Sequence, residues 1–261
     1  MIKFLNECIK CRGQLRTLFS FGLKAKILGT RLGVIWWIID PLILMGVYYF
    51  LIGVVMKRGG DNYHFFVLSG VLVWQTFSRS LSQMTTAFRS NRQLIMSFSS
   101  PLSLYVITPA LVNCFFFVLS MGIVVAFNLD AFSLVSLQLI PLLLVFFCFM
   151  IAIGFIFSCL NVYVRDTHLV VTYTLRVAFY ASPVLYDVSM VANATSIPQW
   201  MKTAYSLNPM VFFITSFRDI LIYGKGIALQ EFAIVSVAVV CALQLSWLVF
   251  QYMRNSLPKM I

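Results

Sequence analysis

The sequence contains few charged residues and very few acids. Of its 261 residues 10% are charged, with 8 Asp and Glu against 19 Lys and Arg, while 61% are hydrophobic. This composition lies far outside that of a soluble globular domain. A formal net charge of +11 would suggest nucleic-acid binding in a soluble protein, but among apolar runs its placement indicates membrane topology. We therefore expect a membrane protein that binds no nucleic acid.

Motifs of enzyme and cofactor chemistry are missing from the sequence. It has no Gly-x-x-x-x-Gly-Lys-Ser/Thr phosphate-binding loop, so the chain is not expected to bind ATP itself. A Gly-rich dinucleotide motif, a Ser/His/Asp set and a cluster of carboxylates are also missing. Cys8 and Cys11 have no second pair or histidine nearby to complete a zinc site. The sequence predicts a transport protein without metal or cofactor, not an enzyme.

Long apolar runs define the predicted fold. A helix crosses a bilayer with about 20 apolar residues. The predicted spans cover 32–56, 63–77, 102–127, 132–160, 168–186 and 227–253, with polar turns at 57–61 and 128–130. The fold class is an all-α membrane protein with six transmembrane helices in a permease domain, residues 32–261.

Basic residues gather at both ends of the chain and in the predicted loops at 79–92 and Arg165. By the positive-inside rule, both termini are expected in the cytoplasm. Residues 1–31 combine this charge with apolar residues at helical spacing, which indicates an amphipathic helix lying in the cytoplasmic interface, although a solvated basic tail fits nearly as well.

Two segments between spans are expected to carry short helices. Residues 89–100 form a polar loop before Pro101, where the third span begins. Residues 187–226 mix prolines and charges with aromatic residues and are too polar for a clean crossing. We expect one or two short helices there, dipping partly into the membrane where protein or water surrounds them.

Asp40 is an acid inside the first span, and Pro41 follows it directly. The acid either caps a half-helix that begins at Pro41 or faces a partner inside the bundle. In the fifth span, Tyr173, Arg176 and Tyr180 share one helical face, which should line a cavity or a subunit interface. Because Asp40 and Arg176 lie at similar predicted depth, we hypothesise that they pair.

Taken together, these residues resemble the permease subunits of ABC exporters for O-antigen, capsule and teichoic-acid polymers. The motifs that carry the resemblance span essentially the whole chain: Leu32-Gly33 with Trp36 or Trp37, Pro41 and Tyr48; Arg165-Asp166; Ser182-Pro183 with Tyr186; and Asn208-Pro209 with Arg218 and Gly224. An acid at Asp40 is not part of that family pattern.

The resemblance implies a homodimer in the inner membrane, bound to two copies of a separate ATP-binding subunit, that exports a polyprenyl diphosphate-linked glycan such as O-antigen. It assigns the coupling helix to 89–100 and gating helices to 188–226. It also implies that the first and fifth spans line the channel, and the residues of these spans that we expect to do so are Trp36, Trp37, Asp40, Tyr173, Arg176 and Tyr180. Those for ATPase coupling are Arg89, Arg92 and Arg165, and those for periplasmic gating are Pro198, Trp200, Asn208, Pro209 and Arg218.

Two other functions remain open from the sequence. A proton-coupled secondary transporter would use Asp40 and Arg176 as a relay and need no ATPase, but no inverted repeat is visible. An ABC permease of the same fold could instead move drugs or lipids. Aromatic faces mildly favour a glycan, because they stack on the C–H faces of sugars.

Overall fold

The computed structural model describes residues 7, 9–29, 31–57, 63–98, 100–127, 134–195, 197–254 and 256–257. Within these residues the regular secondary structure is all helical, with no strand. The helices are α2 (Arg12–Leu28), α3 (Ile35–Tyr48), a π-helix (Tyr49–Val55), α4 (Tyr63–Ser90), α5 (Arg92–Ser97), α6 (Leu102–Phe127), a 3₁₀ helix (Leu134–Gln138), α7 (Leu139–Tyr163), α8 (Thr167–Tyr180), α9 (Val188–Asn193), α10 (Gln199–Ser206), α11 (Pro209–Tyr223) and α12 (Leu229–Met253). The all-α prediction is confirmed.

Four helical stretches are long and apolar enough to cross a membrane: Ile35–Val55, Leu102–Ala126, Leu134–Tyr163 and Leu229–Met253. They correspond to the predicted first, third, fourth and sixth spans. The predicted second and fifth spans correspond to α4, which has 28 residues but a polar second half, and to α8, which has 14 residues. The count of six spans therefore stays a prediction. The turn at 128–130 lies outside the described residues, as does the turn at 57–61 apart from Lys57.

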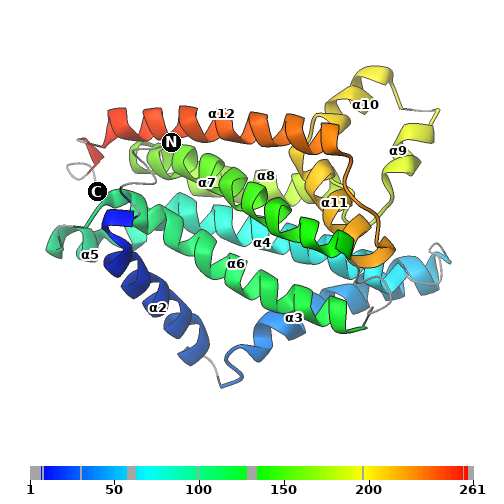
Figure 1. The fold of residues 1–261 in the computed structure, drawn as a ribbon, viewed down its shortest axis with the longest axis horizontal. Coiled ribbons are helices and arrows are strands. Elements are labelled where there is room, and N and C mark those ends of the chain that lie inside the picture. Colours follow the sequence, from blue (N-terminus) through cyan, green and yellow to red (C-terminus); the bar gives the residue numbers. More distant parts are fainter. Residues whose placement is uncertain are drawn as a thin grey trace.

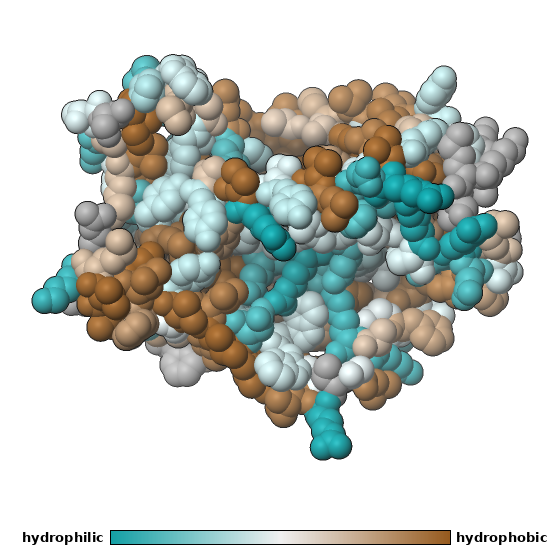
Figure 2. Space-filling model, turned by 180° about the vertical axis from the view of Figure 1, so that it is seen from behind, coloured by the Kyte–Doolittle hydropathy of each residue, from teal (hydrophilic) through white to brown (hydrophobic). Residues whose placement is uncertain are grey.

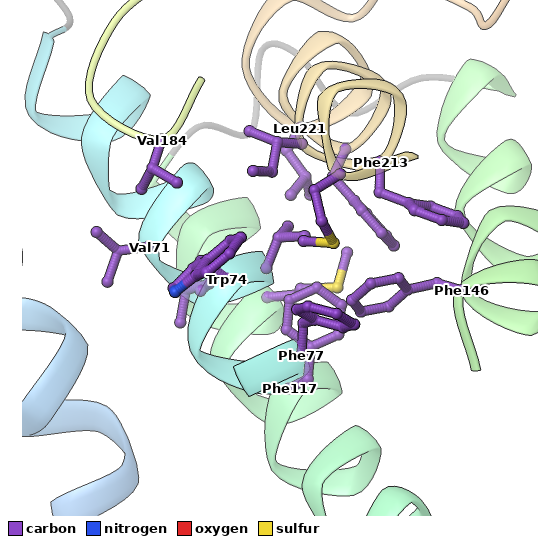
Figure 3. Packing of buried hydrophobic residues seen from close by; sticks show 14 of the residues in the cluster. Val71, Trp74, Phe77, Phe117, Phe146, Val184, Phe213 and Leu221 are labelled. Atoms are coloured by element: carbon purple, nitrogen blue, oxygen red, sulfur yellow. The ribbon is translucent and has the colours of Figure 1, made fainter. Parts of the chain in front are cut away.

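Helix α4 is the centre of the bundle (Figure 1). Most of its residues are buried, and it packs against α6, α7, α8, α11 and α3. Figure 3 shows Trp74 and Phe77 of α4 in one cluster with Phe117 of α6, Phe146 of α7 and Phe213 of α11. The ring centroids of Phe146 and Phe213 lie 5.0 Å apart. Because lipid is as apolar as these side chains, close van der Waals packing holds the helices together.

The first span lies at the edge of the bundle and is continuous. Only 6% of its most apolar window is buried, against 44% for the spans formed by α6 and α7. Helix α3 begins at Ile35 and passes through Asp40 and the buried Pro41 without a break. The expectation that Asp40 caps a half-helix is therefore wrong, because the neighbouring helix satisfies its carboxylate.

Helix α2 precedes the first span and leaves the bundle at an angle (Figure 1). None of its residues is fully buried, and it packs on α6 through Gly22, where an added Cβ would lie 3.0 Å from Val112 Cγ2. Between α2 and α3 the chain turns at Gly33, whose φ of +49° favours glycine. This turn gives a physical role to the Leu32-Gly33 motif.

The region after α8 is more helical than expected. Helix α8 ends at Tyr180, six residues before the predicted end at Tyr186, because the chain turns at Ser182-Pro183. Three helices follow where one or two were predicted. Helices α9 and α10 project from one end of the long helices, and α5 lies at the other end, where α12 also ends (Figure 1). Helix α11 returns into the bundle and ends at Tyr223, followed by Gly224 with φ of +60°.

Candidate functional site

A cavity of about 570 Å³ opens between α3, α4 and α8. Aromatic rings line it from three helices: Tyr48 from α3, Trp74 from α4, and Phe179 and Tyr180 from α8. Helix α8 lies behind α7 in Figure 1, so Figure 2 shows the molecule from the side of this helix. There, hydrophilic surface runs from the middle of the face to the right of the view, with apolar surface at the left and along the top (Figure 2).

Asp40 lies beside this cavity and is bound by two residues of α4. Arg79 Nη2 donates to Asp40 Oδ2 in a salt bridge, and Gln75 Nε2 donates to the same oxygen over 3.1 Å. Gln75 and Arg79 are four residues apart, so they lie on one face of α4. Two polar side chains of the central helix thus satisfy the acid of the first span.

The hypothesis that Asp40 pairs with Arg176 is therefore wrong. Depth along the membrane normal does not tell which helix lies next to Asp40, and α3 packs on α4. Sequence reasoning placed Arg79 in a loop because it ended the second span at Phe77, whereas α4 continues to Ser90. Gln75 fell inside the predicted span but was not considered as a partner of Asp40. The four-residue spacing of Gln75 and Arg79, which puts them on one side of a helix, was the signal in the sequence that could have identified them.

Trp37 faces α6. Its ring stacks on Phe116, with 4.4 Å between centroids and 9° between planes, and the Arg79 guanidinium lies 4.7 Å from its centroid. The neighbouring Trp36 points to the surface and is 45% exposed. Of these two predicted channel residues, Trp37 contacts the charged group beside the cavity.

Lys26 brings α2 into the same cluster. Its Nζ donates to Asn113 Oδ1 over 2.6 Å and lies 4.4 Å from the Trp37 centroid. Asn113 in turn donates to Gln83 Oε1 over 3.2 Å. Burial, followed by the nearby positive charge of Arg79, lowers the pKa of Lys26 to about 8. A basic helix outside the candidate spans is thus tied to the charged interior by one lysine.

Helix α8 presents the face that the sequence predicted for the fifth span, formed by Tyr173, Arg176 and Tyr180. Arg176 and Tyr180 line the cavity, and the Arg176 guanidinium lies 5.4 Å from the ring centroid of Tyr173. Tyr173 and Tyr180 are 61% and 68% exposed. Among the described residues the structure shows no ion pair for Arg176. The face therefore presents a cation between two exposed aromatic rings.

The three predicted coupling residues lie near the end of the bundle that carries α5. Arg89 Nη2 donates to the carbonyl of Val162 over 3.2 Å and so joins the end of α4 to the end of α7. Arg92 begins α5 at the surface, and Arg165 is exposed between α7 and α8. Three apolar residues of α5 and the position after it are also exposed: Leu94, Met96 and Phe98. Sequence reasoning had not singled them out.

The predicted gating residues differ in position. Pro198 is the residue before α10, Trp200 is 70% exposed on that helix, and Pro209 begins α11. Asn208 caps α11, because its Oδ1 accepts from Met210 N over 3.0 Å. Its Nδ2 also donates to Ser182 Oγ over 3.0 Å and to the Ala181 carbonyl over 3.3 Å. Asn208 thereby links the start of α11 to the end of α8.

Arg218 is buried inside the bundle, with 2% exposed. Its Nη2 donates to the carbonyls of Pro183, Val184 and Phe66 over 2.9, 3.2 and 3.3 Å. Tyr63 adds a bond from its hydroxyl to the Leu185 carbonyl over 2.8 Å. Irregular backbone at membrane depth needs such internal partners. The Ser182-Pro183 motif and Arg218, which are far apart in sequence, are thus in direct contact in the structure.

In the described part of the chain, no group of three His, Cys, Asp or Glu residues could hold a metal ion. The fold and the site together define a multi-pass, all-helical membrane protein with a charged and aromatic cavity between its helices. No protein-family model matches the chain.

Curated relatives identify the family. The chain is 30% identical, over 223 residues, to the O-antigen export system permease protein RfbA of Myxococcus xanthus, and the matched region covers 84% of both chains. Two Klebsiella pneumoniae proteins with the same name are 28% identical over 206 and 207 residues, 77% of each chain. The chain belongs to the family of O-antigen export permeases, which confirms the resemblance seen in the sequence. It is a transport permease of the polysaccharide-exporter type.

Proposed function

We propose that the chain forms, as a homodimer, the channel through which an O-antigen-like glycan linked to a polyprenyl diphosphate crosses the inner membrane. ATP hydrolysis in two copies of a separate subunit drives the transport. The similarity to the Myxococcus xanthus permease over 84% of both chains carries this proposal. The missing phosphate-binding loop agrees with it, because an ATP-driven permease without that loop depends on a separate ATP-binding subunit.

The proposed topology has six spans, with α4 and α8 completing the four apolar ones. Residues 1–31 lie on the cytoplasmic side and 32–261 form the permease domain. Helix α5 and the last turn of α12 lie at one end of the bundle, opposite α9 and α10, and this arrangement supports placing both termini on one side (Figure 1). The excess of Lys and Arg in the loops of that end makes it the cytoplasmic one.

Coupling to the ATPase is assigned to α5 and the residues around it. The surface residues Arg92 and Arg165 suit an acidic partner surface, and the exposed Leu94, Met96 and Phe98 supply the apolar part that interface cores need. We assign periplasmic gating to α9–α11, at the other end of the bundle. The exposed Trp200 on α10 and the hydrogen bonds of Asn208 to the end of α8 support this assignment.

The lining of the translocation path is assigned to α3 and α8. Their outward faces are exposed, and Tyr173 and Tyr180 offer flat apolar rings with a hydroxyl group. Such rings stack on sugars while the hydroxyl donates hydrogen bonds. A second copy of the chain facing this surface would enclose a polymer between the two aromatic faces.

Co-purification tests this function. The tagged permease is purified in detergent together with the product of whichever neighbouring gene carries a phosphate-binding loop, and ATPase activity is measured for wild type and for Arg89→Glu/Arg92→Glu. A stable complex whose assembly or hydrolysis collapses in the double variant supports the proposal. The matched control, Arg12→Glu/Arg16→Glu on the exposed side of α2, should retain the complex.

Purification of the permease alone, without ATPase activity, contradicts the proposal. If reconstituted vesicles then showed transport driven by a pH gradient, the protein would be a secondary transporter. The charged pair in that case would be Asp40 and Arg79 with Gln75 beside them, since the structure brings these groups together.

A further inference from the structure

We propose that the cavity between α3, α4 and α8 binds the diphosphate of the exported lipid through Arg79 and Arg176, and that the Asp40 carboxylate competes with it for Arg79. The identity of the anion rests on the proposed function, whereas the place and chemistry of the site rest on the geometry of the cavity.

The polar lining of the cavity consists of groups that donate hydrogen bonds. No carboxylate is among its described lining residues, and the polar side chains are Gln75, Ser78, Arg79, Ser82 and Gln83 from α4 and Thr172 and Arg176 from α8. Two guanidinium groups from two different helices face one space of about 570 Å³. Guanidinium forks match phosphate oxygens in geometry as well as in charge.

One anionic oxygen already occupies part of this donor set. Asp40 Oδ2 accepts from both Arg79 and Gln75, from a position just outside the lining. The donors of α4 are therefore oriented so that they bind an oxyanion. Arg79 lines the cavity and its side chain is 30% exposed, while that of Asp40 is 43% exposed, so the pair is not sealed from a ligand.

The charges at the cavity do not balance. Asp40 compensates Arg79, whereas no ion pair compensates Arg176 among the described residues. An unpaired cation among apolar helices is costly and marks a pathway or a ligand site. A diphosphate could bind Arg176 and Arg79 together, and the carboxylate of Asp40 would then have to leave Arg79.

A second cavity, of about 270 Å³, adjoins the first and is almost wholly apolar. The two share Trp74 and Leu175 in their linings. Phenylalanines of α4 and α7, Phe77, Phe149 and Phe157, form much of the second cavity. A charged cavity beside an apolar one fits an amphiphile with an anionic head and a prenyl tail.

Binding to the purified permease in detergent tests the proposal, with farnesyl diphosphate as the probe. Inorganic pyrophosphate carries the anion alone, and farnesol carries the tail alone. We expect farnesyl diphosphate to bind more tightly than either. Equal affinity for pyrophosphate and farnesyl diphosphate would assign the site to a free diphosphate and overturn its assignment to a lipid.

Two variants should change the affinity in opposite directions. Arg176→Gln removes a charge-assisted contact and should weaken farnesyl diphosphate binding by about tenfold or more. Asp40→Asn keeps an oxygen for Gln75 but removes the competing charge, so it should tighten binding by several fold. Arg12→Gln, on the exposed surface of α2, should leave the affinity unchanged.

Unchanged affinity in both cavity variants, or weaker binding by Asp40→Asn, would overturn the inference. A thermal unfolding profile for each variant verifies that the protein is folded. The outcome is independent of the ATPase experiment, because α5 and the cavity are separate. A permease that couples to its ATPase but binds the probe equally in all variants rejects this inference alone.

Discussion

Arg218 and Pro183 are 35 residues apart in sequence, yet the Arg218 Nη2 group donates to the Pro183 carbonyl over 2.9 Å inside the bundle. The same guanidinium lies 3.4 Å from the ring centroid of Phe66 on α4. One buried side chain therefore fixes the end of α8 against both α11 and α4. If α8 moved relative to α4, either these contacts of Arg218 would break or α11 would have to move with α8.

Removing the guanidinium should destabilise the protein. Arg218→Met leaves carbonyls of the 183–184 turn without their donor in a buried place, which costs about 3 kcal/mol. We expect a clear fall of the apparent melting temperature in detergent, and Arg218→Lys should recover only part of it, since one amine replaces a planar fork. Arg12→Met, at an exposed position, is the control. An unchanged melting temperature for Arg218→Met would contradict this structural role of the guanidinium.

Gly70 allows the close approach of α4 to this turn. An added Cβ would lie 2.6 Å from the Val184 carbonyl oxygen and 2.8 Å from Arg218 Nη2, and the first of these is backbone that cannot move aside easily. Gly70→Ala should therefore destabilise the protein by about 1–3 kcal/mol, as overpacking does, measured by the same thermal unfolding.

Gly122→Ala is the matched control for Gly70→Ala. Both glycines lie inside long helices, but a Cβ at Gly122 meets no atom within 4 Å. This variant should be neutral or slightly stabilising, because alanine favours helices more than glycine does. Equal effects of the two substitutions would show that helix propensity, not the contact with Val184, governs position 70.

The sequence predicted the apolar helices well. Helix α6 has the bounds that were predicted, and α12 begins two residues after the predicted start. Pro101 and long apolar runs mark these boundaries locally, so no tertiary information is needed. Helix α4 was cut short because its second half is polar, although burial against α6 and α7 keeps it helical.

The partners of charged residues could not be predicted in the same way. Arg79 pairs with Asp40, and Arg218 contacts the turn after α8; both contacts depend on which helices are neighbours. Hydropathy gives the depth of a residue along the membrane normal, but it leaves the lateral order of the helices open. The resemblance named Asn208 and Arg218, yet the contacts that explain them appear only in the folded chain.

Asn208 has two roles that a single substitution can separate. Asn208→Asp keeps an oxygen that caps α11 but loses the Nδ2 donor to Ser182 and Ala181. Asn208→Ala loses both. We expect Asn208→Ala to cost about 1–2 kcal/mol of stability, whereas Asn208→Asp should retain stability to a larger extent and lose export activity in a complementation assay. Full export by Asn208→Asp would show that the link to α8 is not needed for function.

Lys26 should make the stability of the protein depend on pH. Its pKa is about 8 in the folded protein and 10.5 in an ordinary environment. Between these values the unfolded state holds more protons than the folded one, so stability rises with pH across this window and the cost of charging Lys26 is fully present below pH 8. The difference amounts to roughly 3 kcal/mol.

Comparison with Lys26→Gln isolates this contribution, because the variant lacks only the Lys26 amine. We expect the apparent melting temperature of wild type to rise relative to that of Lys26→Gln between about pH 8 and about pH 10, the window that the two pKa values set. Lys24→Gln, on the exposed side of the same helix, should follow wild type. Parallel curves for wild type and Lys26→Gln would mean that the amine is well solvated, and the contact of α2 with Trp37 and Asn113 would then lack the burial that the structure shows.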